Sequence, residues 1–280
     1  MIPIGLNPTT IGVSSAWWRE TAIAAEQAGF KGVWSWDHFV SRGKKTDPVL
    51  ECWTTLTAAA AVTSTLKVGS FINNVMNRNP AVLARMLATL CDQALGRVEL
   101  GIGVGGSGPE LTSYGIDLPE PGVRVRILEE AVAVIRLLLA GGPADYQGEF
   151  FSLHEAYAFP TPQPAPRIIV GGEKPGGARL AARVGDGWTT NGTDYEQLLP
   201  VHLEELARVG RSRSDVVHLI AVDLARDVEL AEQPLIADMA TFLGKWHDRG
   251  ADEVVVSWVR VHERDALLDA AVRAGLAGSR

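Results

Sequence analysis

Short apolar runs rich in β-branched residues alternate with amphipathic helical segments along the whole chain. The runs lie at residues 3–6, 32–36, 67–72, 97–102, 167–170, 187–190, 216–224 and 253–259. The helical segments that follow lie at residues 15–28, 50–63, 80 onwards, 123–140, 176–184, 193–210, 233–249 and 264–274. Strands that alternate with helices predict a parallel sheet. Eight such units in 280 residues predict a closed (β/α)8 barrel, the TIM-barrel fold.

The spacing predicts a single domain over residues 1–280. An open, doubly wound sheet ranks second, because it usually contains fewer βα units. Residues 141–166 interrupt the rhythm, and the stretch 145–153 around Gln147-Gly148 predicts a small hairpin. We interpret it as an excursion between the fourth helix and the fifth strand. Near residue 193, Thr193 and Glu196 have the spacing of a helix capping box.

Charge and hydropathy narrow the class of protein. The chain carries 26 Lys and Arg against 33 Asp and Glu, a net charge of −7, which argues against a nucleic-acid partner. No apolar run reaches the ~18 residues of a membrane span, and the first residues lack the pattern of a signal peptide. Cys52 and Cys91 are too few for a disulfide scaffold. We therefore expect a cytoplasmic enzyme with no membrane partner.

The active site of such a barrel lies at the carboxyl ends of its strands. His38, beside Asp37 at the end of the second run, is a residue type that exchanges protons near neutral pH. The alternative is that His38 is a packing residue and Asp37 only orders a turn. No other histidine stands in ligand spacing with His38, so the sequence predicts no metal site.

Two glycine-rich stretches, residues 101–106 and 171–177, follow the fourth and fifth runs. The second opens directly into a helix, whose N-terminus attracts anions, so it predicts a phosphate site. The alternative is a pair of tight turns. Arg42, Lys44 and Lys45 form a basic cluster after the second run, which fits either an anionic ligand or a solvated loop.

Five blocks resemble, in order and over nearly the whole chain, those of the bacterial luciferase-like flavin and deazaflavin oxidoreductases. The blocks are AEQAGF at residues 25–30, WDHF at 36–39, residues 69–84, RVELGIG at 97–103, and IVGG at 169–172 continuing through AARVGDGW at 181–188. The fold of that family is the same eightfold barrel, so the resemblance agrees with the strand count.

Members of this family bind either FMN or coenzyme F420, a 5-deazaflavin. The resemblance implies that His38 supplies a proton and that Asp37 contacts the cofactor. It also implies a non-proline cis peptide at Phe71–Ile72 or the next bond, with Asn73 and Asn74 beside the cofactor ring. The further implied cofactor contacts are Val104, Gly105, Lys174, Pro175, Gly177 and Ala178.

The Asp-His pair, the missing long luciferase insertions and the basic cluster, which would meet the deazaflavin's oligoglutamate tail, favour F420. The predicted function is hydride transfer between F420 and an unidentified small organic substrate. One alternative is an FMN-dependent monooxygenase served by a separate flavin reductase. Another is a flavin-binding protein without catalysis. A metal-dependent hydrolase lacks its ligand set here. The resemblance also implies a homodimer.

One departure concerns the substrate. Related sugar-phosphate dehydrogenases place a glutamate, as a second acid/base, just after the glycines of the fourth strand. This chain has Gly106 there, and Pro109 where those enzymes have a ring-contacting asparagine. Glu110 is the nearest carboxylate. We therefore expect an oxidoreductase that acts on a substrate other than a sugar phosphate.

Overall fold

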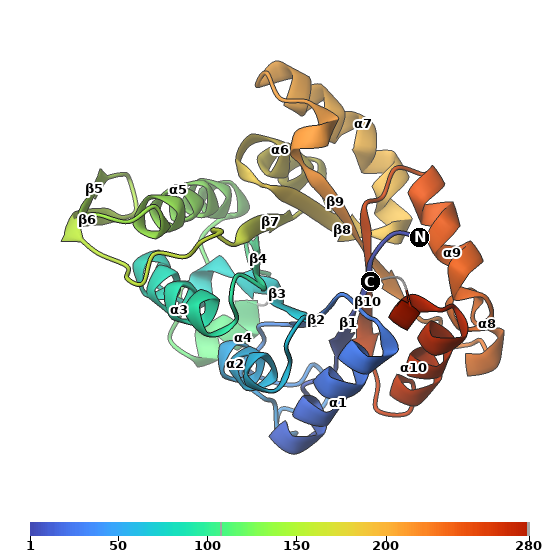
Figure 1. The fold of residues 1–280 in the computed structure, drawn as a ribbon. Coiled ribbons are helices and arrows are strands. Elements are labelled where there is room, and N and C mark those ends of the chain that lie inside the picture. The colour runs from blue at the N-terminus through green and yellow to red at the C-terminus, as the bar shows by residue number, and fades with distance from the viewer. Residues whose placement is uncertain (107, 279–280) are drawn as a thin grey trace.

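The computed structural model describes residues 1–106 and 108–278. Its centre is a closed barrel of parallel strands in the order β1-β10-β9-β8-β7-β4-β3-β2, ringed by helices (Figure 1). The barrel strands are β1 (Ile4–Pro8), β2 (Gly32–Ser35), β3 (Lys67–Asn74), β4 (Val98–Gly103), β7 (Arg167–Gly171), β8 (Gly187–Asn191), β9 (Val217–Asp223) and β10 (Glu253–Val259). The predicted (β/α)8 fold is confirmed.

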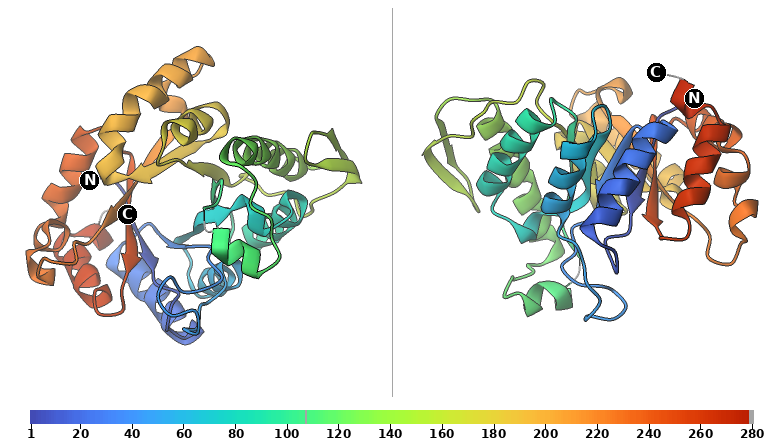
Figure 2. Two further views of the ribbon diagram at one scale, coloured as in Figure 1. Left: turned by 180° about the vertical axis from the view of Figure 1, so that it is seen from behind. Right: turned by 60° about the horizontal axis from the view of Figure 1, so that its bottom comes forward.

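The helices pack around the outside of the barrel, apart from the short helix at Gly108–Ser113, which projects from one end (Figure 2). They are α1 (Ser15–Ala28), α2 (Cys52–Val62), α3 (Pro80–Gln93), α4 (Gly108–Ser113), α5 (Pro121–Leu139), α6 (Pro175–Val184), α7 (Gly192–Arg208), α8 (Pro234–Ala237), α9 (Met239–Asp248) and α10 (Arg264–Arg273). Local signals set several of their ends. The Ser14 hydroxyl caps α1 by accepting the Trp17 N–H at 3.1 Å. Gly29 ends that helix in the left-handed conformation, at φ 91°.

Trp34 fills the barrel interior near the amino ends of the strands. Its indole lies across Gly5, Gly32 and Gly69, where an added Cβ would overlap the ring. Glycine at these three positions therefore makes room for one large side chain. Around it, Phe71 and Val255 belong to the same small apolar cluster inside the barrel.

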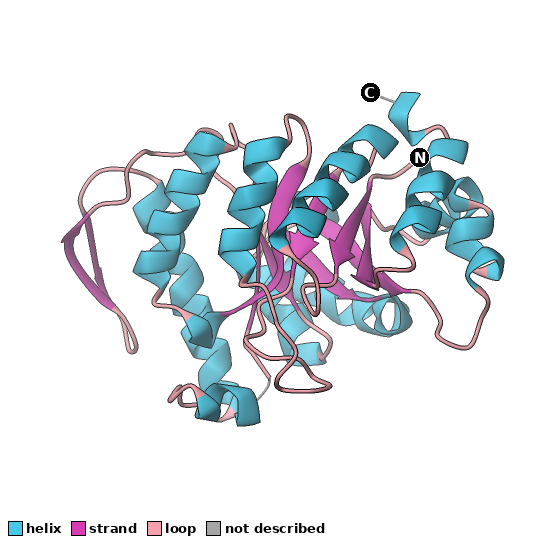
Figure 3. Ribbon diagram, turned by 90° about the horizontal axis from the view of Figure 1, so that it is seen from below, coloured by secondary structure: helices cyan, strands magenta, loops and turns pink. Residues whose placement is uncertain are grey.

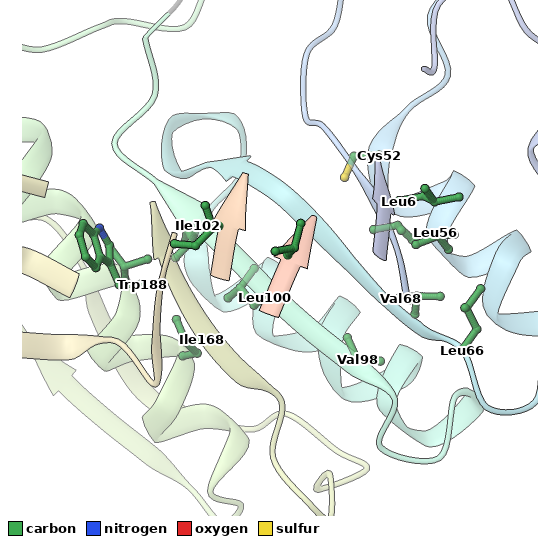
Figure 4. Close-up of a cluster of buried hydrophobic side chains, with 14 of the residues drawn as sticks. Leu6, Cys52, Leu56, Leu66, Val68, Val98, Leu100, Ile102, Ile168 and Trp188 are labelled. Atoms are coloured by element: carbon green, nitrogen blue, oxygen red, sulfur yellow. The ribbon is translucent and has the colours of Figure 1, made fainter. Parts of the chain in front are cut away.

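A second and larger apolar layer lies between the strands and the helices. Figure 4 shows part of this layer, including Leu56 from α2, Val68 from β3 and Leu100 from β4, all fully buried. Truncating one such side chain to alanine typically costs 2–5 kcal/mol. This layer fixes the barrel wall and hence the positions of the strand ends.

The loop after β2 and α4 project together from one end of the barrel, away from the chain termini (Figure 2). A two-stranded antiparallel sheet, β5 (Ala144–Gln147) and β6 (Ser152–Ala156), lies outside the barrel between α5 and β7 (Figure 3). Within residues 1–106 and 108–278, no helix has the length and apolar character needed to cross a membrane.

Two local predictions were wrong, and one short helix was not predicted. The helix expected at 233–249 is interrupted at Asp238, which leaves the helical conformation and caps α9 through the Thr241 N–H at 3.0 Å. The capping box at Thr193 is not formed, because α7 already begins at Gly192. The short helix α4 was not among the predicted helices, because it has only six residues and its glycine and proline disfavour helix.

Candidate functional site

A cavity of about 690 Å³ opens at the carboxyl ends of the barrel strands. Each of the eight strands, or the loop that directly follows it, contributes at least one lining residue. This volume lies within the range of small-molecule and cofactor sites. The cavity is therefore the candidate active site, at the face where (β/α)8 barrels carry their chemistry.

His38 lies in the wall of this cavity. Its Nδ1 is 2.7 Å from the Glu110 Oε2, and its Nε2 is 3.2 Å from a guanidinium nitrogen of Arg42. The carboxylate can only accept a hydrogen bond when charged, so Nδ1 carries the proton towards Glu110. Nε2 is then unprotonated and accepts the Arg42 N–H, so it can exchange a proton with a ligand once the Arg42 guanidinium turns to that ligand.

Glu110 comes from α4, and 7% of its surface is exposed. Its other oxygen accepts the backbone N–H groups of Phe39 and Val40. Burial by itself would raise the pKa of Glu110, but the hydrogen bonds from His38 and from the Phe39 backbone hold that pKa below its ordinary value. Glu110 is therefore a charged residue that holds His38 from behind the cavity wall.

Arg42 extends this arrangement on the mouth side of the cavity. Its guanidinium lies 5.2 Å from the ring centroid of Trp258. The rings of Trp258 and Trp36 meet edge to face, with their centroids 4.4 Å apart. The ring centroids of Trp36 and His38 are 4.5 Å apart. Trp258 has a φ of 55°, a left-handed conformation that is uncommon for non-glycine residues and is often found at functional sites.

Asp37 is buried, and one oxygen of its carboxylate accepts several hydrogen bonds from the protein. Its Oδ2 is 2.7 Å from Arg78 and accepts hydrogen bonds from the Asn74 backbone and the Asn77 amide at 3.0 Å. Burial raises the pKa of Asp37, while Arg78 and the two asparagines oppose that shift. Although Asp37 lines the cavity, its contacts tie β2 to the end of β3.

The end of β3 bulges into the cavity. The Phe71–Ile72 peptide is cis, at one of the two bonds expected, and the pairing of β3 with β4 shifts register between Ser70 and Asn73. The Asn73 side chain is held by Trp53 at 3.0 Å. The bulge therefore presents backbone and the Ile72 side chain to the cavity from a rigid support.

The loop after β7 leads directly into α6. Lys174 occupies the N-cap position of α6 without a side-chain capping bond, and Pro175 follows as the first helical residue. The backbone N–H groups of Gly176 and Gly177 belong to the first turn and therefore lack helical acceptors. Ala178, by contrast, donates its N–H to Lys174. The open N–H groups and Lys174 form a site suited to an anion.

Further features of the cavity fit a phosphate-bearing cofactor. An added Cβ at Gly106 or Gly176, both of which line the cavity, would meet no protein atom within 4 Å. Thr189 and Thr190 of β8 also belong to the lining, and their hydroxyls are buried without a hydrogen-bond partner in the described part of the chain. The open glycines leave room at the cavity wall for a ligand group.

The structure brings most of the predicted site residues to one place. Those in the cavity lining are Asp37, His38, Phe71, Ile72, Asn73, Asn74, Val104, Gly105, Lys174 and Gly177. Pro175 and Ala178 are outside the lining, and Pro175 has no N–H to offer a phosphate. Sequence reasoning assigned no role in the site to Trp258, Thr189 or Arg78. Their signal is weak, because single residues at strand ends do not form a motif.

The fold and the site together define a (β/α)8-barrel protein with a cofactor-sized cavity and a loop suited to an anion at its carboxyl face. Residues 8–264 match the luciferase-like monooxygenase family, so the chain belongs to that family. The resemblance stated from the sequence is therefore confirmed.

Three known proteins illustrate this membership. An F420-dependent glucose-6-phosphate dehydrogenase of Kineococcus radiotolerans is 34% identical over 217 residues, 75% of this chain and 64% of that protein. The chain thus spans less than two thirds of that relative's length. A solved F420-dependent secondary alcohol dehydrogenase superposes with a TM-score of 0.84 at 21% identity, covering 98% of this chain and 99% of the other. The solved EDTA monooxygenase of Chelativorans sp. BNC1 superposes with a TM-score of 0.77 at 14% identity. This match covers 99% of this chain and 95% of the other.

Proposed function

We propose that this protein is an F420-dependent oxidoreductase that transfers a hydride between the deazaflavin and a small organic substrate. One observation carries the proposal. His38, with Nδ1 fixed by Glu110, and the open N-terminus of α6 line the same cavity. The similarity to F420-dependent dehydrogenases supports the choice of cofactor.

The residues present fit the cofactor. Lys174 and the backbone N–H groups of Gly176 and Gly177 would hold its phosphate. The Phe71–Ile72 bulge and the loop at Val104–Gly105 would contact its ring. When bound, the deazaflavin supplies or accepts a hydride and reacts poorly with oxygen.

The chain's own residues complete the proton balance of the reaction. Reduction of a carbonyl group to an alcohol adds one hydride to carbon and one proton to oxygen, and oxidation removes both. His38 gives or takes that proton at Nε2. Glu110 keeps Nδ1 protonated and stabilises the imidazolium that forms in the oxidation direction.

An FMN-dependent monooxygenase is the second candidate, favoured by the superposition on EDTA monooxygenase. A phosphate loop such as that of α6 would hold FMN equally well. The two candidates differ in the fate of oxygen, because reduced FMN reacts with it.

The test is a pair of turnover assays on the purified protein. Oxidation of reduced F420 is followed by absorbance with a panel of ketones, aldehydes, enones and imines, and reduction of F420 is followed with alcohols. Oxygen uptake is measured separately with reduced FMN. Substrate-dependent turnover of F420 without oxygen uptake supports the proposal. Oxygen uptake that requires reduced FMN, with no F420 turnover, would replace it by the monooxygenase.

A further inference from the structure

Three positive side chains line the cavity. Lys174 and Arg42 lie on opposite walls, and Arg124 of α5 donates to the backbone oxygens of Val104 and Gly105. Lys174 follows β7, whereas Arg42 follows β2 and packs on Trp258 at the end of β10. In the barrel order, β7 is three strands away from β2 in one direction and three strands from β10 in the other. A cofactor whose phosphate lies at α6 therefore leaves the Arg42 side of the cavity to the other reactant.

Arg42 is held in place but is not neutralised. Its guanidinium packs on Trp258 and reaches the Nε2 of His38 at 3.2 Å. No carboxylate within the described residues lies at ion-pair distance from it: Glu110 is bound to His38, and Asp37 to Arg78. The remaining acidic residue of the lining, Glu173, follows β7 on the far wall.

This geometry suits one planar anion. A guanidinium presents a fork of N–H donors that matches a carboxylate in two parallel hydrogen bonds. On this wall Arg42 is the one cation that lines the cavity among the described residues, so the available charge matches a carboxylate better than a doubly charged phosphate ester. The indole rings of Trp36 and Trp258 provide an apolar surface beside it.

We propose that Arg42, braced by Trp258, binds the carboxylate of the substrate next to the proton-exchanging nitrogen of His38. The substrate class is then a carbonyl or hydroxyl compound whose reacting carbon lies close to a carboxylate, as in 2-oxo acids and their 2-hydroxy acid products. This inference rests on the proposed oxidoreductase function, because it assigns the second ligand of the same cavity.

Binding of two matched ketones to the F420-loaded protein tests this inference by calorimetry. Phenylpyruvate and phenylacetone differ in that a carboxylate of the first is a methyl group in the second. We expect wild-type protein to bind phenylpyruvate roughly tenfold or more tightly than phenylacetone, as a charge-assisted pair predicts. Arg42→Leu should abolish the difference, and Arg42→Lys should retain part of it.

Two controls separate this inference from the proposed function. Lys45→Leu removes a neighbouring exposed cation that is outside the cavity lining and should keep the preference. Because Arg42 lies three strands away from the α6 phosphate loop, this inference assigns it to the substrate and not to the oligoglutamate tail expected from the sequence. Affinity for F420, measured by fluorescence, should therefore stay within about twofold of wild type in Arg42→Leu. Failure of wild type to bind F420 would refute the proposed function, and binding of the two ketones would then be measured on the apo protein.

The role of Arg42 has its own refuting result. Equal or undetectable binding of both ketones to wild type, or an undiminished preference for phenylpyruvate in Arg42→Leu, would overturn it.

Discussion

Replacing Glu110 by glutamine should change the state of His38 while leaving the fold intact. The glutamine carbonyl can still accept the Phe39 and Val40 N–H groups that the carboxylate accepts now. Its NH₂ group then faces Nδ1 of His38, where the carboxylate oxygen lies at 2.7 Å. Because an NH₂ group only donates, Nδ1 must become the acceptor, and the proton moves to Nε2.

The size of the effect follows from the lost bond. A hydrogen bond to a charged partner contributes about 1.5–3 kcal/mol, which corresponds to a roughly 10- to 150-fold fall in kcat. F420 affinity should change little, because the phosphate loop at α6 is not altered. The carbonyl-reduction rate of the variant should also begin to fall at a lower pH than in wild type, because the imidazolium has lost its carboxylate.

The assay is steady-state oxidation of reduced F420 across pH, with the best substrate from the carbonyl panel. Glu120→Gln is the matched control, since Glu120 is exposed and makes no side-chain capping bond at the start of α5. A Glu110→Gln enzyme with wild-type kcat and an unmoved pH profile would refute the view that Glu110 acts through His38.

Three further predictions test the site and its support. His38→Ala should lower turnover by roughly 10²–10⁴ with F420 affinity retained, and unchanged turnover would remove His38 from the mechanism. Arg78→Leu leaves the buried Asp37 carboxylate without its ion-pair partner and should lower the free energy of unfolding in urea by about 3 kcal/mol. An unchanged urea midpoint would show that the Arg78–Asp37 pair does not stabilise the fold. Burial lowers the pKa of His202 to about 4 and that of His218 to about 2, from 6.5. Unfolded chains therefore bind more protons below pH 6.5. Stability should fall by about 1.4 kcal/mol per pH unit for each histidine, from pH 6.5 down to the pKa of that histidine in the folded protein. Replacing both by glutamine should flatten this fall, and an equally steep fall in the double variant would exclude these two histidines as its cause.

The barrel could be predicted because each strand and helix carries its own local signal. Apolar runs such as Glu253–Val259 stand between clear helix starts and stops, so the eight units can be counted in sequence. The interrupted helix at Asp238 could not be predicted in the same way. Its apolar pattern continues through the break, and the structure alone shows that the Asp238 carboxylate caps a new helix.

Site residues that directly follow a strand could be predicted from the sequence. Contacts between segments that are far apart in the sequence could not. His38 and the glycines of the α6 loop follow strands directly, so their placement follows from the fold. The pairing of His38 with Glu110 joins the loop after β2 to α4, a helix too short to leave a helical pattern in the sequence. The contact between Arg42 and Trp258 joins the second strand to the last, a relation that exists only once the barrel closes.

A fluorescence titration of the apo protein with F420 and, separately, with FMN tests the central claim most directly. Wild type should bind F420 with micromolar or tighter affinity and in preference to FMN. Gly176→Leu places a side chain where an added Cβ meets no protein atom, at the open N-terminus of α6. This variant should fold normally yet bind F420 roughly tenfold or more weakly. Preference for FMN, or F420 binding that Gly176→Leu leaves unchanged, would contradict the assignment of this cavity to a deazaflavin held at α6.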